Sequence, residues 1–220
     1  MATNRSDIQS GERGRNLMDW LQMNGRVMGI GAAIIVVALA GFWFYSRSRQ
    51  IRTVNAERSL TLAQQSLASG NTNLALSDLQ KVATRYEGTA AGTEAAMLLA
   101  RQQYDQGKFQ DGINVLTKVS DKAGPSRANV ESLIGDGYSQ LGKANDAAKA
   151  YERAAEAAGP YESEAAYYRA KAARSYASGG NVQEAKRVWG ALAEQTKSPS
   201  VAAEAKVRLA ELNARRAGQS

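Results

Sequence analysis

The apolar residues form two kinds of pattern along the chain, one continuous uncharged run and then a series of periodic segments. The run, Val27–Tyr45, holds nineteen residues without a charge. As an α-helix it would be about 28 Å long, close to the roughly 30 Å hydrocarbon core of a bilayer. Aromatic residues 42–45 close the run, at the level where amphipathic rings favour the headgroups. The pattern predicts a transmembrane helix at residues 26–46.

Two other interpretations of this run are less consistent with the sequence. A buried core helix of a soluble protein would usually carry a polar face. A cleaved signal peptide could use the small residues of Ala38-Leu39-Ala40, but the mature chain would then begin with the apolar sequence GFWFY. Its leader would also hold acidic residues in the part that is normally basic. We therefore expect an uncleaved anchor that contacts membrane lipid through Val27–Tyr45.

The segments on either side of the anchor are expected to differ. Residues 1–25 form an N-terminal tail, in which residues 12–24 place Leu17, Trp20, Leu21 and Met23 toward one side of a short amphipathic helix. Such a helix would lie at the membrane interface, and a solvated tail is the alternative. Residues 46–69 contain no proline or glycine, so the anchor helix is able to continue into the remaining domain, residues 47–220.

That domain has an internal repeat. Glycines recur at spacings of 37, 35 and 38 residues, and each ends one helical pattern and precedes another. A small residue stands five positions after each glycine, and a large apolar residue nine positions after it. The repeated positions are Gly70, Gly107, Gly142 and Gly180; then Ala75, Gly112, Ala147 and Ala185; then Leu79, Leu116, Tyr151 and Trp189.

A period in the mid-thirties with two helices per unit is the signature of the tetratricopeptide repeat. We therefore predict an all-α fold, in which the anchor is followed by a tetratricopeptide-repeat α-solenoid of about four helical hairpins and a capping helix. The capping helix, residues 200–214, would face inward with Ala205, Leu209 and Leu212. Generic helical hairpins that share a length are the alternative, but they would not explain the coincident small residues.

The complete arrangement resembles a known family. A segment with Trp20 and Asn24-Gly25 precedes one anchor and an Arg-rich flank, and degenerate repeats then begin AERSLTLAQQSLASGN and end SGGNVQEAKRVWGALAEQ. Over most of residues 15–215 this resembles the bacterial ancillary subunits of the Sec translocon. The resemblance implies a bacterial inner-membrane, single-pass protein with a cytoplasmic N-terminus and a periplasmic repeat domain. The implied partners are export-channel subunits or periplasmic chaperones.

The charge distribution does not add support for that orientation. Near the anchor, three arginines lie on the N-terminal side and four on the C-terminal side, so the positive-inside rule does not decide. Residues 1–52 carry a net charge of +4 and the other 168 residues +3. The excess positive charge therefore lies around the membrane segment. The repeats contain no basic stripe of the kind that binds nucleic acid.

The residue types exclude most catalytic sites. The chain has no cysteine and no histidine, which rules out disulfides, thiolate or imidazole metal sites and a Ser-His-Asp triad. Gly135-Asp136-Gly137 lies inside a helical pattern and lacks the phosphate-binding GxGxxG or GK[ST] motifs. We expect a protein that is not an enzyme and that uses no cofactor, no metal and no small-molecule substrate.

Protein binding remains as the predicted function. In tetratricopeptide arrays the first helix of each repeat lines the inner face, although any one of its residues can equally be an ordinary solvated position. Met97, Arg101 and Asp105 stand where a clamp for a C-terminal carboxylate has Lys, Asn and Asn, which disfavours chaperone C-terminal tails. The predicted inner face consists of Glu94, Met97, Arg101, Tyr104, Asp105, Asn129, Ser132, Asp136, Ser139, Gln140, Tyr167 and Arg174.

We therefore predict a non-enzymatic, membrane-anchored scaffold near the Sec export channel and periplasmic folding factors. The alternative is an accessory subunit of another inner-membrane complex, held mainly through its transmembrane helix. Small residues of the anchor such as Gly31, Ala38 and Gly41 would permit close contacts between helices.

Overall fold

The computed structural model describes the backbone of residues 5–217, and the side chains of residues 30, 31 and 33–214. Over this part of the chain the regular structure is entirely helical, which confirms the predicted all-α class. The chain divides into two compact units, Met1–Ile51 and Arg52–Ser220. Each unit is described by itself.

The first unit contains the N-terminal part of helix α1 (Arg5–Ala68). From Ile30 onward the described large apolar side chains of this unit are exposed, with Phe42 and Phe44 both at 71%. Within the described part of the chain, no helix combines the length and the apolar character that are needed to span a bilayer. The side chains of residues 26–29 and 32 of the predicted anchor, and those of the segment 12–24, lie outside the described ones. The anchor stays a prediction.

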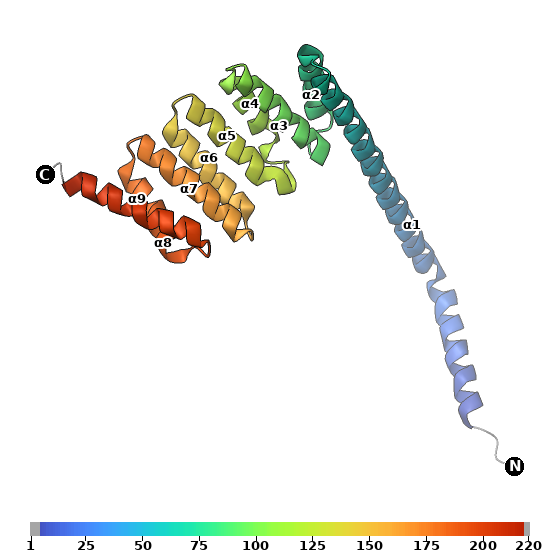
Figure 1. Cartoon of the computed structure of the whole chain (residues 1–220). Coiled ribbons are helices and arrows are strands. Elements are labelled where there is room, and N and C mark those ends of the chain that lie inside the picture. Colours follow the sequence, from blue (N-terminus) through green and yellow to red (C-terminus); the bar gives the residue numbers. More distant parts are fainter. Residues whose placement is uncertain (1–4, 218–220) are drawn as a thin grey trace. The chain divides into compact units, whose positions relative to one another are not determined.

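The second unit is a stack of helical hairpins. Figure 1 shows α2 to α9 lying side by side in chain order, and each helix from α2 onward contacts the next. Residues 52–68 of α1 form the first hairpin with α2, and Ala63 shares a buried cluster with Leu79. The remaining elements are α2 (Thr72–Arg85), α3 (Ala90–Asp105), α4 (Phe109–Ser120), the 3₁₀ helix η1 (Gly124–Ser126), α5 (Arg127–Gln140), α6 (Ala144–Ala158), α7 (Glu162–Ser178), α8 (Val182–Gln195) and α9 (Pro199–Ala217).

The recurrent glycines end the first helix of each hairpin. Gly70, Gly107, Gly142 and Gly180 have φ between +71° and +79°, a left-handed conformation that carries no steric cost for glycine. The residue after each glycine donates its N–H to the carbonyl five positions earlier, as in Lys143 to Tyr138 at 2.9 Å. This is the six-to-one bond of the Schellman motif. The turns predicted from glycine spacing are confirmed.

The repeated small and large residues form the core. Ala75, Ala147 and Ala185 are fully buried, and the large residues nine positions after each glycine are at most 4% exposed. A Cβ atom on Gly112 would lie 2.3 Å from Tyr104 Cε1, so this glycine makes room for an aromatic ring. The small residues thus permit close helix contacts, as predicted.

Helix α9 closes the C-terminal end of the stack. Ala205 and Leu212 are buried, and Leu209 is partly buried against the same cluster, which includes Trp189 of α8. The predicted capping helix is therefore present, with the inward residues that its periodicity indicated.

Candidate functional site

Each first helix exposes the same four positions, at i, i+4, i+7 and i+11. We call these positions the first-helix face. They are exposed or half-buried throughout, whereas the positions around them are mostly buried from α3 onward. The face consists of Glu57, Thr61, Gln64 and Ala68 of α1; Glu94, Leu98, Arg101 and Asp105 of α3; Asn129, Leu133, Asp136 and Gln140 of α5; and Tyr167, Lys171, Arg174 and Ser178 of α7.

Eight of the twelve residues predicted from the sequence lie on this face: Glu94, Arg101, Asp105, Asn129, Asp136, Gln140, Tyr167 and Arg174. Two others do not, because Met97 and Ser132 are only 6% and 9% exposed. Each of them immediately precedes a face residue. Because successive residues of a helix are rotated by about 100°, the side chain one position before the face points into the core. Their assignment to an exposed surface is corrected.

The last two predicted residues lie beside the face. Tyr104 is half-buried between first helices, and its hydroxyl donates to the carbonyl oxygen of Leu133 at 3.0 Å. Ser139 is exposed but stands one position before Gln140. Neither of them belongs to the repeated stripe.

Eight residues of the face were not predicted from the sequence: the four on α1, Ser178 on α7, and Leu98, Leu133 and Lys171 at the i+4 position. The last three each stand four residues after a predicted position. A step of four residues from Glu94, Asn129 or Tyr167 would have found them, since residues four apart lie on one side of a helix.

A polar network joins the face in the third and fourth hairpins. The carboxylate oxygen Oδ1 of Asp136 accepts hydrogen bonds from Lys171 Nζ and from the Tyr151 hydroxyl, each at 2.7 Å. The ammonium of Lys171 also lies 4.4 Å from the centroid of the Tyr151 ring, within the range of a cation–π contact. Tyr151 comes from α6, so three helices meet at one carboxylate.

The network depends on a glycine. A Cβ atom on Gly135 would lie 2.5 Å from Tyr151 Cε1, so the ring occupies the space that a side chain would need. Burial, followed by the hydrogen bond to Asp136, raises the pKa of the Tyr151 hydroxyl well above its usual value. The hydroxyl is therefore held as a donor at neutral pH.

Further polar contacts link the first helices to one another and to the capping helix α9. The hydroxyl of Tyr168 lies 3.0 Å from Asn129 Oδ1 and 2.9 Å from Glu164 Oε1. Arg174 binds Glu204 of α9 through two nitrogen atoms, at 2.8 Å and 2.6 Å. The hydrogen bond from Arg174 holds the pKa of the Glu204 carboxyl below its usual value. In these hairpins the charges of the face are largely compensated.

The α3 part of the face differs in this respect. Within the described part of the chain, no ion pair involves Glu94, Arg101 or Asp105. Leu98 stands between these charges along the helix and is half-buried. Uncompensated charges around an apolar side chain are suited to binding a peptide segment, because they can pair with a partner without first breaking internal ion pairs.

The described residues hold no group of three or more His, Cys, Asp or Glu side chains that could bind a metal ion. The first-helix face offers carboxylates, guanidinium groups, an ammonium group and hydroxyls.

Comparison with known proteins agrees with this architecture. The model of the tetratricopeptide repeat-like domain matches residues 18–129 and 55–171. No curated protein matches the chain.

Among solved structures, the nearly identical TPR-like repeats of a Podosopora anserina protein, assigned as a kinesin light chain, are similar in fold. The TM-score is 0.52 at 20% identity, covering 74% of this chain and 89% of that one, and a single-residue variant of the same protein gives the same values. A thermophilic TPR protein of Thermus thermophilus has a TM-score of 0.42 at 23% identity, covering 71% of this chain and 80% of that one. With its family match and its stack of hairpins, the chain belongs to the tetratricopeptide repeat-like domain family.

Proposed function

We propose that this chain is a non-enzymatic, membrane-anchored scaffold that binds protein partners through the first-helix face. Tetratricopeptide repeats generally mediate protein–protein interactions. The observation that carries the proposal is the contrast along the face: Glu94, Arg101 and Asp105 of α3 are uncompensated, whereas Asp136 and Arg174 are bound to other residues of the chain. The partner would contact the α3 part of the face.

The internal pairs in the later hairpins support this role. The bond between Asp136 and Lys171 joins α5 to α7, and the bond between Arg174 and Glu204 joins α7 to α9. Each bond therefore passes over one intervening helix of the chain. Such bonds oppose changes in the spacing of the stacked helices. A face that keeps its shape loses less conformational entropy when a partner binds.

The location and partners in the proposal rest on the resemblance described above. We infer a bacterial inner-membrane protein whose Val27–Tyr45 segment contacts lipid, with a cytoplasmic N-terminus and a periplasmic repeat domain. Its partners would be subunits of the Sec export channel or periplasmic chaperones. The exposed side chains of Phe42, Trp43 and Phe44 also fit contacts with another transmembrane helix, so an accessory subunit of a different inner-membrane complex is the second candidate.

Site-specific photocrosslinking in native membranes tests this function. A crosslinking amino acid in place of Arg101 should give adducts with channel subunits or periplasmic folding factors. The control is the same amino acid in place of Lys149, which is exposed on the second helix α6, and it should give none of these adducts. Equal adducts from both positions would remove the first-helix face from the proposal. Adducts with a single unrelated membrane complex would favour the second candidate.

A further inference from the structure

Within the described part of the second unit, no helix covers the N-terminal end of the helix stack. Leu62 is 63% exposed, whereas the residues at the same position of the following repeats, Leu99, Ile134 and Ala172, are at most 2% exposed. Arg58, one turn earlier, is also exposed, and its equivalents Ala95, Val130 and Tyr168 are buried. In repeats two to four these positions lie on first helices that pack against the second helix of the preceding hairpin. The first hairpin has no such hairpin before it within the second unit.

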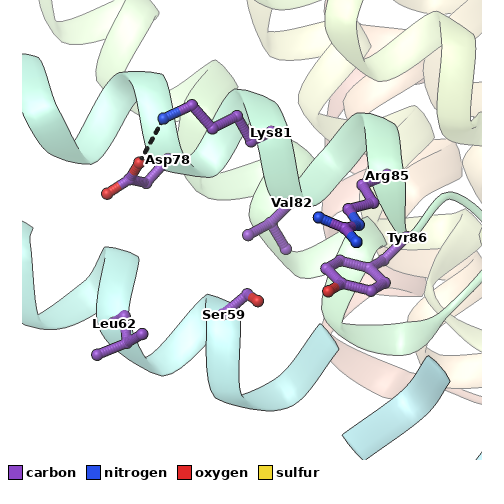
Figure 2. A pocket seen from close by; sticks show the side chains of 7 residues that line it. All are labelled: Ser59, Leu62, Asp78, Lys81, Val82, Arg85 and Tyr86. Atoms are coloured by element: carbon purple, nitrogen blue, oxygen red, sulfur yellow. Dashed lines mark hydrogen bonds and ion pairs between the residues drawn. The ribbon is translucent and has the colours of Figure 1, made fainter. Parts of the chain in front are cut away.

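A groove lies at this end of the stack. It has a volume of about 240 Å³ and lies between residues 52–68 of α1 and helix α2. Figure 2 shows Ser59 and Leu62 on one side, and Val82 and Arg85 of α2, with Tyr86 directly after it, on the other. The opposite side of α2, with Gln80 and Thr84, lines a hollow with α4. The groove is therefore on the side of α2 that faces away from the next hairpin.

The charges around the groove are mainly basic. Lys81 and Asp78 neutralise each other in an ion pair of 3.0 Å. Arg85 lies 5.8 Å from the ring of Tyr86, and Arg52 donates to the carbonyl oxygens of Arg85 and Glu87 at 3.3 and 3.0 Å. Among the described residues no carboxylate pairs with Arg52, Arg58 or Arg85. Arg85 thus lines the groove beside the apolar side chains of Leu62 and Val82, and Arg52 and Arg58 on α1 add two further guanidinium groups without a carboxylate partner.

We propose that this groove, which we call the end groove, binds an acidic amphipathic helix of a partner protein. The helix takes the place that the second helix of a preceding hairpin takes in the later repeats. Its apolar side chains contact Leu62 and Val82, and its carboxylates pair with Arg58 and Arg85. Binding of an amphipathic helix through its apolar face is a common mode of recognition. This surface is separate from the first-helix face, so the two proposals can fail independently.

Two other occupants fit the observations less well. The end groove, at about 240 Å³, is smaller than the roughly 300–1,000 Å³ of small-molecule pockets. A second copy of the chain, paired by a two-fold axis, would bring the same arginines of both copies together, since such an interface joins identical patches. Like charges placed opposite each other oppose that pairing.

The test uses the full-length chain in nanodiscs of uncharged lipid and a fluorescent synthetic helical peptide. The peptide carries leucines at i, i+4 and i+7 with flanking glutamates. Two matched peptides have lysines instead of glutamates, or serines instead of leucines. The acidic peptide with its leucines should bind, measured by fluorescence anisotropy, and both matched peptides should bind much more weakly.

Variants then locate the site. Leu62→Glu should weaken binding of the acidic peptide roughly tenfold or more, as substitution of a central contact residue does. Val207→Glu, at a position 57% exposed on α9, is the matched control and should change the affinity by less than about twofold. Arg85→Glu should weaken the acidic peptide and strengthen the lysine peptide, whereas Lys118→Glu on α4 should do neither.

The proposal is overturned if the acidic peptide does not bind, if it binds no better than the lysine peptide, or if Leu62→Glu leaves its affinity unchanged. Light scattering after size exclusion examines self-association of the same samples. A dimer that Leu62→Glu dissociates would assign the end groove to a second copy and would also overturn the proposal.

Discussion

The close contact between Gly135 and Tyr151 gives the sharpest prediction about what stabilises the stack. In Gly135→Ala the new Cβ atom would lie 2.5 to 2.9 Å from three carbon atoms of the Tyr151 ring. The ring must move, and its hydroxyl then leaves the position 2.7 Å from Asp136. The substitution therefore combines a steric clash with loss of a hydrogen bond to a charged acceptor.

The magnitude follows from these two effects and from one that opposes them. Overpacking a tight contact costs about 1–3 kcal/mol, and a hydrogen bond to a charged group contributes about 1.5–3 kcal/mol. Alanine is better than glycine in a helix by about 1 kcal/mol. The expected net loss is about 2–4 kcal/mol, which for a chain of this size lowers Tm by roughly 5–15 °C.

The same substitution elsewhere provides the control. Gly190 lies inside α8, and nothing lies within 4 Å of the Cβ atom that alanine would add. Gly190→Ala should therefore gain only the helix propensity, about 1 kcal/mol, and raise Tm by a few degrees. The two variants of the full-length chain in mild detergent should shift in opposite directions in thermal melts followed by far-ultraviolet circular dichroism.

A double-mutant cycle with Tyr151 separates the steric clash from any other effect of the substitution at Gly135. With Tyr151→Leu the ring is absent, so the additional change Gly135→Ala should cost little, and the two substitutions should be strongly non-additive. A Gly135→Ala chain that melts at or above the wild type would refute the reasoning. Additive losses in the double variant would show that the ring is not what the new methyl group meets.

Three further predictions concern packing, pH dependence and topology. Ala147→Leu, at a fully buried position, should lower stability by about 1–3 kcal/mol, whereas Lys149→Leu on the exposed side of the same helix should stay within about 0.5 kcal/mol; the reverse order in thermal melts would contradict the repeat register. Because Arg174 lowers the pKa of Glu204, the pair stabilises the fold above the usual glutamate pKa, and this contribution is lost as the pH falls through the lowered value. Denaturant melts of wild type and Arg174→Gln should therefore differ at neutral pH and converge in acid, and a difference that persists in acid would assign the effect to packing. Ser178→Cys, exposed at the end of α7 in a chain without native cysteine, should react with a membrane-impermeant thiol reagent in intact spheroplasts; labelling only after lysis would place the domain in the cytoplasm.

The stripe on the first helices shows how far periodicity can be used. Glu94, Arg101 and Asp105 follow the spacing of one helix side, and the structure exposes or half-buries all three. Met97 stands four residues before Arg101 and Leu98 three residues before it, and both spacings fit the same side of a helix. Only Leu98 lies on the face, because Met97 is buried in the core. A helix turns by about 100° per residue, so an error of one position is enough to exchange a core residue for a surface residue.

The sequence by itself determined the local features of this protein. The four glycines that end the first helices, the small residues five positions later and the inward residues of α9 follow from backbone conformation and helix periodicity, which act over a few residues. Tertiary structure alone decided which groups meet across the stack. Asp136 is 15 residues from Tyr151 and 35 residues from Lys171. No local pattern specifies that Tyr151 and Lys171 both donate hydrogen bonds to the carboxylate of Asp136. The different exposure of Leu62 and Leu99 has the same origin. Both fit the same repeat position, but only Leu99 has a preceding hairpin to cover it, and burial depends on the neighbour that packing supplies.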